Sequence, residues 1–376
     1  MKKLLLITIA ALFCLTAISQ TYPTFGPEKP VTISGLTFDA MEPFLSADGN
    51  YMFFNSLNDG VNTSLYYASR VNDTTFTFIG QVNGVNYPAP HLDAVASMDS
   101  LNNFYWVTTR NYPNTMDNFC HGAFNAGNVT DTGRVHGNFY IYSPGWLIMD
   151  ATINHGGNLL YYCNAYFNNC NIPCWSTMGI AVKITDTTFA KLPSSDTNLQ
   201  LVNDTNYINY APAITKDELE LYFTRVLRSN PSQSEICVAV RSNSSANFSA
   251  PSVIYASALI PEGPTLTADK TKMYYHKKDG ALYKLFLRYR TTITNIEETE
   301  NEIVAVYPNP SNNILTIIPA LKNEEFFVDI YSLQGQKLLT SLKTTVIDIS
   351  TLAPGVYTVV VKQKNKHWKN KIVKYQ

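Results

Sequence analysis

Apolar and polar positions alternate over most of the chain, in short runs that end at Asn, Asp, Ser or Gly. This alternation is typical of antiparallel strands joined by tight turns. One such unit reads EPFLSADGNYMFF at residues 42–54, where a proline and an apolar pair precede a polar turn and an aromatic-rich strand. Similar stretches begin at residues 89, 150, 211 and 263, although the third has Ala151 in place of proline. The pattern predicts five copies of one turn-and-strand unit.

A second half of the unit is visible from residues 65, 180 and 236, where a strand ends at a basic residue and a polar turn leads to phenylalanine. Each copy then supplies about four strands, and a spacing of about 50 to 60 residues suits the blades of a β-propeller. The last copy offers only three strands, whereas the segment from Phe25 resembles an outermost strand without a blade. We therefore expect an all-β fold with a five-bladed β-propeller at residues 20–292, closed by its N-terminal strand.

The turn itself resembles the TolB-like, or WD40-like (PD40), propeller repeats, whose motif is P-x-L-S-x-D-G before an aromatic strand. Pro43, Leu45, Asp48 and Gly49 match this motif, and the fifth copy matches it with Lys270 in place of glycine. The resemblance covers roughly residues 25–290. It implies a fold more than an activity, because one fold supports many functions.

Charge and the N-terminus bear on partners and location. Only 15% of the residues are charged and the formal net charge is −1, which gives no basic field for nucleic acid. Lys2 and Lys3 precede an apolar run from Leu4 to Leu15 and a small-x-small segment at Ala17–Ser19, so residues 1–19 are predicted to be a signal peptide. The run is too short to span about 30 Å of hydrocarbon. We expect an exported protein.

Export permits disulfides among the five cysteines beyond the signal peptide, and their odd number leaves at least one unpaired. Cys163, Cys170 and Cys174 lie close together in a segment that reads as a loop after a strand. A disulfide within this loop is the simpler interpretation, and a zinc site is the alternative. A structural zinc site needs four ligands, and His121 beside Cys120 is the only plausible helper. We therefore expect neither a metal nor a cofactor.

The composition changes at TNIEETENEI, which predicts an acidic linker at residues 293–302. The alternating strands and tight turns that follow predict a compact Ig-like β-sandwich at residues 303–376. Its blocks VYPNPSNN, DIYSLQGQKL, IDISTLAPGVYTVVV and KIVKY resemble, in order, the type A C-terminal sorting domain of type IX secretion cargo in Bacteroidetes. The resemblance implies partners in the type IX secretion machinery and its sorting protease, removal of the module, and release or attachment at the cell surface.

Candidate chemistry lies just before each repeated turn, because these residues are expected to face the central channel of a propeller. From the alignment of the copies they are Glu42, Ala89, Asp150, Ala211 and Gly263, with Glu262 adjacent. Convergence of Glu42, Asp150 and Glu262 would supply the carboxyl pair of a glycosidase, which stands roughly 5 to 9.5 Å apart. The competing interpretation is that these carboxylates bind backbone donors of a neighbouring blade.

Three tryptophans in or beside the expanded copies, Trp106, Trp146 and Trp175, are candidates for stacking on a ligand or for packing between blades. No G-x-S-x-G segment is present, so the sequence contains no sign of an attached serine peptidase. The favoured expectation is a secreted or surface-displayed propeller that binds a glycan or protein on one face. The alternative is a secreted carbohydrate-active hydrolase that uses the axial carboxylates.

Overall fold

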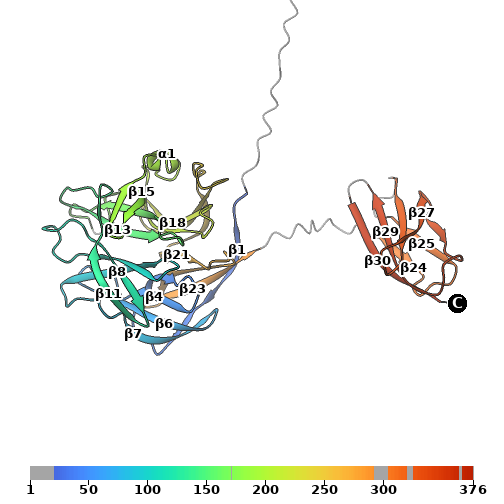
Figure 1. The fold of residues 1–376 in the computed structure, drawn as a ribbon, viewed down its shortest axis with the longest axis horizontal. Coiled ribbons are helices and arrows are strands. Elements are labelled where there is room, and N and C mark those ends of the chain that lie inside the picture. The colour runs from blue at the N-terminus through green and yellow to red at the C-terminus, as the bar shows by residue number, and fades with distance from the viewer. Residues whose placement is uncertain (1–20, 171, 292–303, 320–324, 364–365, 376) are drawn as a thin grey trace, which may run out of the picture. The chain divides into compact units, whose positions relative to one another are not determined.

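The computed structural model describes residues 21–170, 172–291, 304–319, 325–363 and 366–375 (Figure 1). The chain divides into two compact units, residues 1–292 and 293–376. The signal peptide predicted at 1–19 and the linker predicted at 293–302 lie outside the described residues. Both units are all-β, and the only helix in the described part of the chain is the single turn α1 (Ser195–Asn198). None of the described residues forms a helix with the length and apolar character needed to cross a membrane.

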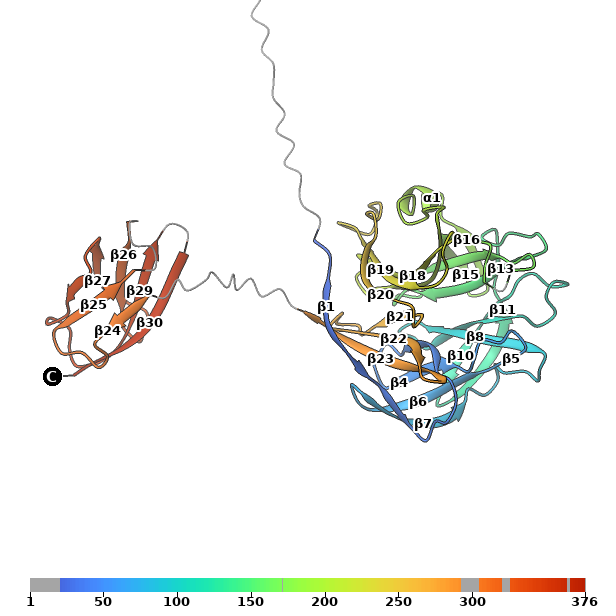
Figure 2. The same ribbon diagram turned by 180° about the vertical axis from the view of Figure 1, so that it is seen from behind.

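Three sheets of the first unit each contain four antiparallel strands in chain order and one short strand added in parallel (Figures 1 and 2). The first sheet contains β3 (Met41–Leu45), β4 (Tyr51–Asn55), β6 (Leu65–Asn72) and β7 (Thr75–Gln81), with β2 (Thr32–Ser34). The second contains β8 (His91–Met98), β9 (Asn103–Thr108), β10 (Phe119–Asn125) and β11 (Asn128–Arg134), with β5 (Asn62–Thr63). The third contains β13 (Trp146–Ile153), β14 (Leu159–Tyr166), β15 (Trp175–Thr185) and β16 (Thr188–Lys191), with β12 (His136–Gly137).

The fourth and fifth sheets have four antiparallel strands each. The fourth contains β17 (Tyr207–Ile214), β18 (Glu220–Leu227), β19 (Ser234–Val240) and β20 (Ser252–Ser257). The fifth contains β21 (Glu262–Leu266), β22 (Lys272–Asp279), β23 (Leu282–Thr291) and the N-terminal strand β1 (Thr24–Pro30). β1 pairs with β23, and Glu28 accepts a hydrogen bond from the hydroxyl of Tyr275 at 2.6 Å. The first strand of the unit thus covers the free edge of the last sheet.

The first strands of the five sheets form a closed ring, since β3 contacts β8, β8 contacts β13, β13 contacts β17, β17 contacts β21 and β21 contacts β3. Each of the five hydrophobic clusters in this unit lies between two neighbouring sheets. Phe53 of the first sheet, for example, lies 5.1 Å from Phe104 of the second, ring centre to ring centre. Large aromatic side chains therefore fix each sheet against the next, and the starts of the inner strands meet around one axis.

The second unit has two sheets. One contains β24 (Ala305–Tyr307), β25 (Ile314–Ile318) and β28 (Val346–Asp348), and the other contains β26 (Phe327–Tyr331), β27 (Lys337–Leu342), β29 (Gly355–Gln363) and β30 (Lys366–Lys374). Their apolar side chains share one core, which includes Leu315, Val328 and Val359. The lysine-rich strand β30 lies at the edge of its sheet, where charged side chains discourage pairing with other chains.

Candidate functional site

Four inner strands carry a β-bulge at the same place in the repeat, and β13 carries a register shift one residue earlier, at Met149. The residues at the aligned place, called the bulge residues below, are Glu42, Val95, Asp150, Ala211 and Gly263. Four of them have a left-handed backbone, with φ between 50° for Glu42 and 63° for Gly263. A bulge breaks the in-and-out alternation of a strand and redirects its side chains, and bulges are frequent beside active sites. The repeat therefore places one redirected residue from each sheet near the axis.

The second copy differs from the expectation, because Val95 and not Ala89 occupies the bulge. The turn hydrogen bonds set the register: the N–H of Asp99 bonds to Asn103 just as the N–H of Ser46 bonds to Tyr51. Counting back four residues from Ser46 gives Glu42, and counting back four from Asp99 gives Val95. The alignment that starts at Ala89 is wrong because Pro90 resembles the proline of the motif but precedes β8. Ala96 stands where the first, fourth and fifth copies have proline.

The backbone N–H groups of four bulge residues donate to the preceding sheet in the ring. The pairs are Glu42 with Nδ1 of His276 (3.0 Å), Val95 with Oδ1 of Asn55 (3.4 Å), Gly263 with Oγ1 of Thr224 (3.2 Å), and Ala211 with the carboxyl group of Asp150. Asp150 thus does what the competing interpretation expects, since it accepts a backbone donor of the next sheet. Glu42 and Glu262 are not used in this way among the described contacts.

Two cavities meet at the ring of bulges. A cavity of about 550 Å³ lies on the side where the inner strands begin and is bordered by Glu42 and Glu262. A channel of about 100 Å³ lies on the side of the repeated turns and is bordered by Glu42 and Asp150. The structure therefore brings the three predicted carboxylates together around the axis, but only Glu42 borders both spaces. A molecule in the larger cavity meets Glu42 and Glu262, and Asp150 lies beyond them.

The carboxyl group of Glu42 is held in conditions that favour its protonated form. Burial raises its pKa well above the ordinary value, and the negative charges of Asp150 and Glu262 raise it further. Its Oε1 accepts a hydrogen bond from Nδ2 of Asn58 at 2.9 Å, which opposes the shift. Its Oε2 is buried and has no hydrogen-bond partner among the described residues. Glu42 is therefore suited to donate a proton.

The surroundings of Asp150 also favour its protonated form, and this residue is more enclosed, with 1% of its surface exposed. Burial raises the pKa of Asp150 to about 7, the N–H of Ala211 opposes this shift, and the charge of Glu262 adds to it. Its Oδ2 is buried without a partner in the described part of the chain. Asp150 therefore acts on its surroundings mainly through its charge and through the Ala211 contact.

The carboxyl group of Glu262 lies beside Tyr210 and His276. Its Oε1 accepts a hydrogen bond from the hydroxyl of Tyr210, and its Oε2 lies 3.5 Å from Nε2 of His276. Because Nδ1 of the buried His276 accepts the N–H of Glu42, the ring proton lies on Nε2, on the side of Glu262. This nitrogen makes no hydrogen bond at that distance, so the Tyr210 hydroxyl is the donor to Glu262 among the described residues, and His276 Nε2 lies close to its second oxygen. Tyr210, His276 and Asn58 are site residues that sequence reasoning missed. The only sequence signal for His276 is its place opposite Glu262 in the predicted hairpin.

The three tryptophans do not border either cavity. Trp106 is 1% exposed in the cluster between the first two sheets, so its proposed role in ligand stacking is wrong and packing between sheets is its use. Trp146 packs on Tyr166 with 5.2 Å between ring centres. The guanidinium of Arg228 lies 4.5 Å from the ring centre of Trp175. Both half-buried rings thus already have partners on one face.

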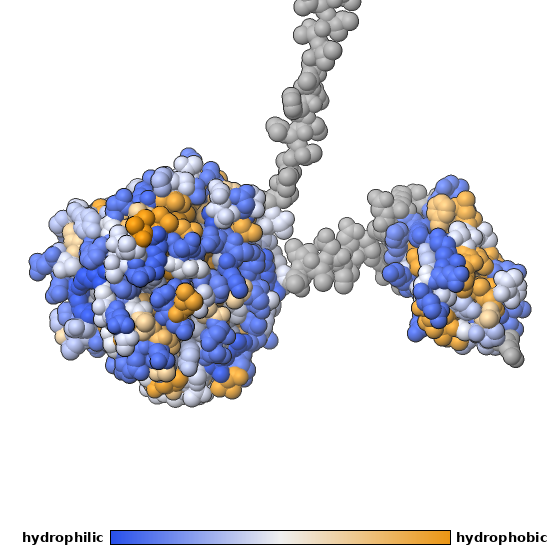
Figure 3. Space-filling model, in the orientation of Figure 1, coloured by the Kyte–Doolittle hydropathy of each residue, from blue (hydrophilic) through white to orange (hydrophobic). Residues whose placement is uncertain are grey.

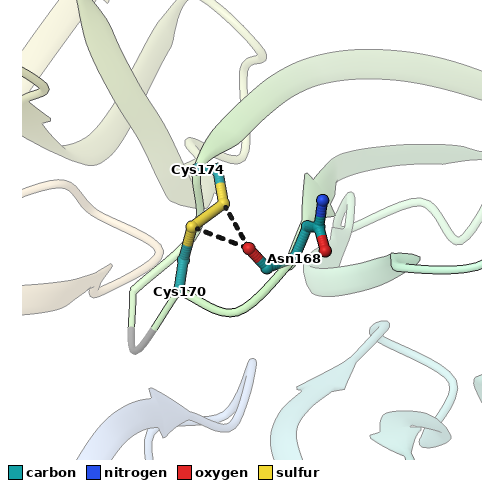
Figure 4. The surroundings of a disulfide bond; sticks show 3 residues. All are labelled: Asn168, Cys170 and Cys174. Carbon is teal, nitrogen blue, oxygen red and sulfur yellow. Dashed lines mark hydrogen bonds between the residues drawn. A yellow bond between two sulfur atoms is a disulfide. The ribbon is translucent and has the colours of Figure 1, made fainter.

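The loop between β14 and β15 is closed by a disulfide between Cys170 and Cys174, whose sulfurs lie 3.4 and 3.7 Å from the carbonyl oxygen of Asn168 (Figure 4). Cys120, Cys163 and Cys237 are free and buried, and burial raises the pKa of Cys120 to about 11 and of Cys237 to about 12. These thiols are thus poorly suited to act as nucleophiles. No group of His, Cys, Asp and Glu in the described ranges has an arrangement that would hold a metal ion.

Comparison with known proteins identifies the second unit. Residues 305–375 match the family described as the secretion system C-terminal sorting domain. The predicted sorting domain is therefore confirmed, and it implies interaction with the type IX secretion machinery. The protein is exported to the cell surface or secreted, and its C-terminal domain is removed. No curated protein matches the chain in sequence.

Solved structures similar to the first unit include a thermostable family-43 glycoside hydrolase, with 12% identity, 71% of this chain and 93% of that chain covered, and a TM-score of 0.45. Zg3597, a family 117 glycoside hydrolase from Zobellia galactanivorans, is 10% identical over 77% of this chain and 96% of its own, with a TM-score of 0.47. An endo-arabinase from Bacteroides thetaiotaomicron VPI-5482 is 12% identical over 71% and 98%, with a TM-score of 0.46.

Proposed function

We propose that the first unit is a five-bladed β-propeller of the TolB-like (PD40) kind, whose blades are the five sheets around the ring of inner strands. A signal peptide at residues 1–19 precedes it, and a linker at 293–302 joins it to an Ig-like sorting module at 303–376. Support comes from the contact of each inner strand with the next and from the pairing of β1 with β23. In this arrangement the bulge residues surround the propeller axis.

We further propose that the protein is a secreted carbohydrate-active hydrolase, with Glu42 as the acid and Glu262 as the base or nucleophile. One observation carries this proposal: two carboxyl groups from different sheets border the same cavity in opposite surroundings. Glu42 is half-buried and its pKa is raised, whereas Glu262 accepts a hydrogen bond from the hydroxyl of Tyr210 and faces Nε2 of His276. Two carboxyl groups in one site whose surroundings differ in this way are typical of a general acid paired with a base or nucleophile.

The reaction adds water across a glycosidic bond. Glu42 gives its proton to the leaving oxygen as the bond between that oxygen and the anomeric carbon breaks. Water supplies the hydroxyl group that ends on the anomeric carbon, and the remaining proton restores the acid. Asp150 assists at a distance, because its negative charge raises the pKa of Glu42. His276 is a positioning residue that connects the backbone of Glu42 to the carboxylate of Glu262.

The test is hydrolysis by the secreted protein of a panel of aryl glycosides and polysaccharides. Glu42→Gln and Glu262→Gln are each expected to lower kcat by about 10²- to 10⁴-fold. The control Asp196→Asn changes a carboxylate whose side chain is 77% exposed, and it is expected to leave kcat within twofold. Activity that survives both glutamine substitutions, or a wild type that cleaves no member of the panel, would refute the hydrolase.

Binding without catalysis is the second candidate, and the apolar lining of the larger cavity favours it. Most of the lining side chains are aliphatic or aromatic and carry no group that takes part in acid–base chemistry. On this proposal the secreted protein retains a ligand in the cavity and Glu42 and Glu262 only orient it. Tight binding that persists in Glu42→Gln, with no turnover by the wild type, would favour this candidate.

A further inference from the structure

The walls of the larger cavity are aliphatic because of where the repeat places its side chains. Leu92, Leu147, Ile208 and Ile260 each stand three residues before a bulge residue, and all four line the cavity. Met41 and Met149 stand one residue before a bulge residue and line it as well. Four sheets therefore present an aliphatic side chain at the same place in the repeat, and the remaining sheet contributes Met41. The aliphatic lining is a property of the whole ring and not of one loop.

Outer loops extend this apolar lining. Phe167, Ile172 and Pro173 border the cavity from the segment that contains the disulfide between Cys170 and Cys174 (Figure 4). On the face of the first unit in Figure 3, by contrast, hydrophilic residues predominate and apolar ones form small separate groups. The cavity is thus more apolar than this outer surface. An apolar molecule that enters it removes more of its apolar surface from water than it would on the outer surface, which favours binding in the cavity.

Polar groups around the cavity are mostly occupied by contacts within the protein. Oδ1 of Asp59 accepts the N–H groups of Val61 and Asn62 at 2.9 and 2.7 Å. Oγ1 of Thr109 accepts the N–H of Leu92 at 2.9 Å, and Oγ of Ser234 donates to the carbonyl oxygen of Pro261 at 2.8 Å. At the inner end, Oε2 of Glu42 is buried without a partner among the described residues.

We infer that this cavity binds an amphiphilic small molecule, with an aliphatic body along the walls and one uncharged or cationic polar end at Glu42 and Glu262. The cavity volume of about 550 Å³ lies within the usual range for sites that bind small molecules. Hydroxyl groups of a sugar chain placed along the walls would lose water without gaining partners. An anionic end would lie beside Glu262 and be repelled by its negative charge. The inference deepens the proposed hydrolase and rests on it in one respect: the aliphatic body is then the aglycone of the glycoside that is cleaved.

Binding is measured on the secreted wild-type protein by displacement of N-phenyl-1-naphthylamine, an uncharged apolar fluorophore, with octan-1-ol, octylamine and octanoate at pH 8. Octanol and octylamine are expected to displace the dye at concentrations at least about tenfold lower than octanoate. Leu147→Gln places an amide on the wall and is expected to weaken octanol binding about tenfold, whereas Leu147→Met keeps the wall apolar and binds within twofold. Leu101→Gln changes a leucine that is 79% exposed and serves as the surface control.

Thermal unfolding shows first that each variant is folded, and the inference is judged on the folded ones. No displacement by octanol, equal displacement by octanoate, or an effect of Leu101→Gln as large as that of Leu147→Gln would overturn it. Turnover of octyl glycosides and of sugar-only oligosaccharides separates the inference from the proposed function. Octanol binding without any turnover contradicts the hydrolase and supports the amphiphile site. Efficient cleavage of oligosaccharides without octanol binding supports the hydrolase and contradicts the amphiphile site.

Discussion

Glu42 has a left-handed backbone, with φ of 50°, that an L-residue other than glycine rarely adopts. Strained residues of this kind cluster at functional sites. Val95 and Ala211 have nearly the same φ at the same place, so the conformation belongs to the repeat. What distinguishes Glu42 is its carboxyl group at the meeting point of two cavities and the acceptor that His276 offers its N–H.

Substitution of His276 tests this arrangement. His276→Leu removes the acceptor for the N–H of Glu42, and an unpaired buried N–H costs about 1–3 kcal/mol. His276→Asn retains an oxygen acceptor, so it is expected to lose clearly less stability. Urea unfolding at pH 7 measures both free energies. Equal stability of the two variants would show that the hydrogen bond to Glu42 does not hold the bulge. In the hydrolase, both variants are also expected to shift the pH profile of kcat, which a purely structural role would leave in place.

Asp150 is predicted to make stability depend on pH. Burial, opposed by the N–H of Ala211, raises its pKa from 3.8 to about 7. The native state therefore keeps a proton that the unfolded chain releases between these values, so this contribution is complete below pH 3.8 and is lost as pH rises through about 7. Asp150→Asn has no such proton and is expected to reduce the fall in Tm between pH 5 and pH 8. Part of the dependence of Tm on pH is expected to remain in this variant, because the pKa of Glu42 is raised as well. The control Asp196→Asn is expected to behave as wild type, and an undiminished fall in Asp150→Asn would contradict the assignment.

Single residues were predictable from the sequence only where the repeat motif marks them. Glu42, Asp150 and Glu262 precede the repeated turn and do gather around the axis. Val95 was missed because Pro90 imitates the motif six residues before the position that the turn hydrogen bonds assign to proline. His276 stands on the second strand of its sheet, and only the pairing of that strand with β21 brings it to Glu262.

At the scale of strands, the bulge offers a matched pair of substitutions. Ala211 has φ of 50°, and Ala213 is two residues further along β17 without a left-handed backbone, yet each is 9% exposed. Glycine at residue 211 removes the strain of a left-handed alanine in the folded state. This gain offsets the stability that is lost because glycine increases the conformational entropy of the unfolded chain. Ala211→Gly is therefore expected to stay within about 0.5 kcal/mol of wild type or to exceed it, and Ala213→Gly is expected to lose about 1 kcal/mol. Urea unfolding compares them, and equal losses would contradict strain at the bulge.

Most long strands were predictable, because alternation and turn residues mark them in the sequence. Residues 42–54 illustrate this, since the expected turn and strand correspond to the end of β3 and to β4. The short parallel strands β2, β5 and β12 have two or three residues each and follow no alternation. Each forms where a connecting segment pairs with the edge strand of a sheet, and this pairing depends on contacts between residues distant in the sequence.

At the scale of the whole molecule, each unit has a core of its own. Among the described residues, the five hydrophobic clusters of the first unit contain none beyond 291. In the second unit Asp329, 2% exposed, accepts from Nζ of Lys362 at 2.7 Å and from Oγ1 of Thr340 at 2.7 Å. Lys337 also lies 3.2 Å from this carboxylate, and both lysines reach solvent, with 33% of the Lys362 side chain and 49% of the Lys337 side chain exposed. Asp329 is therefore the buried acceptor on which three side chains of the sorting module converge.

Export can therefore be separated from the fold of the first unit. Deletion of residues 303–376 is expected to leave a folded first unit in the periplasm, whereas the full chain reaches the cell surface or the medium. Asp329→Ala is expected to destabilise the module that the secretion machinery recognises and to reduce export, because Lys337, Lys362 and Thr340 lose their common acceptor. Lys343→Ala, at an exposed ion pair with Glu325, is the control and is expected to be exported. Cell fractionation with an antibody against the first unit measures all four proteins. Export of the deleted chain would show that the first unit carries its own signal for passage through the outer membrane.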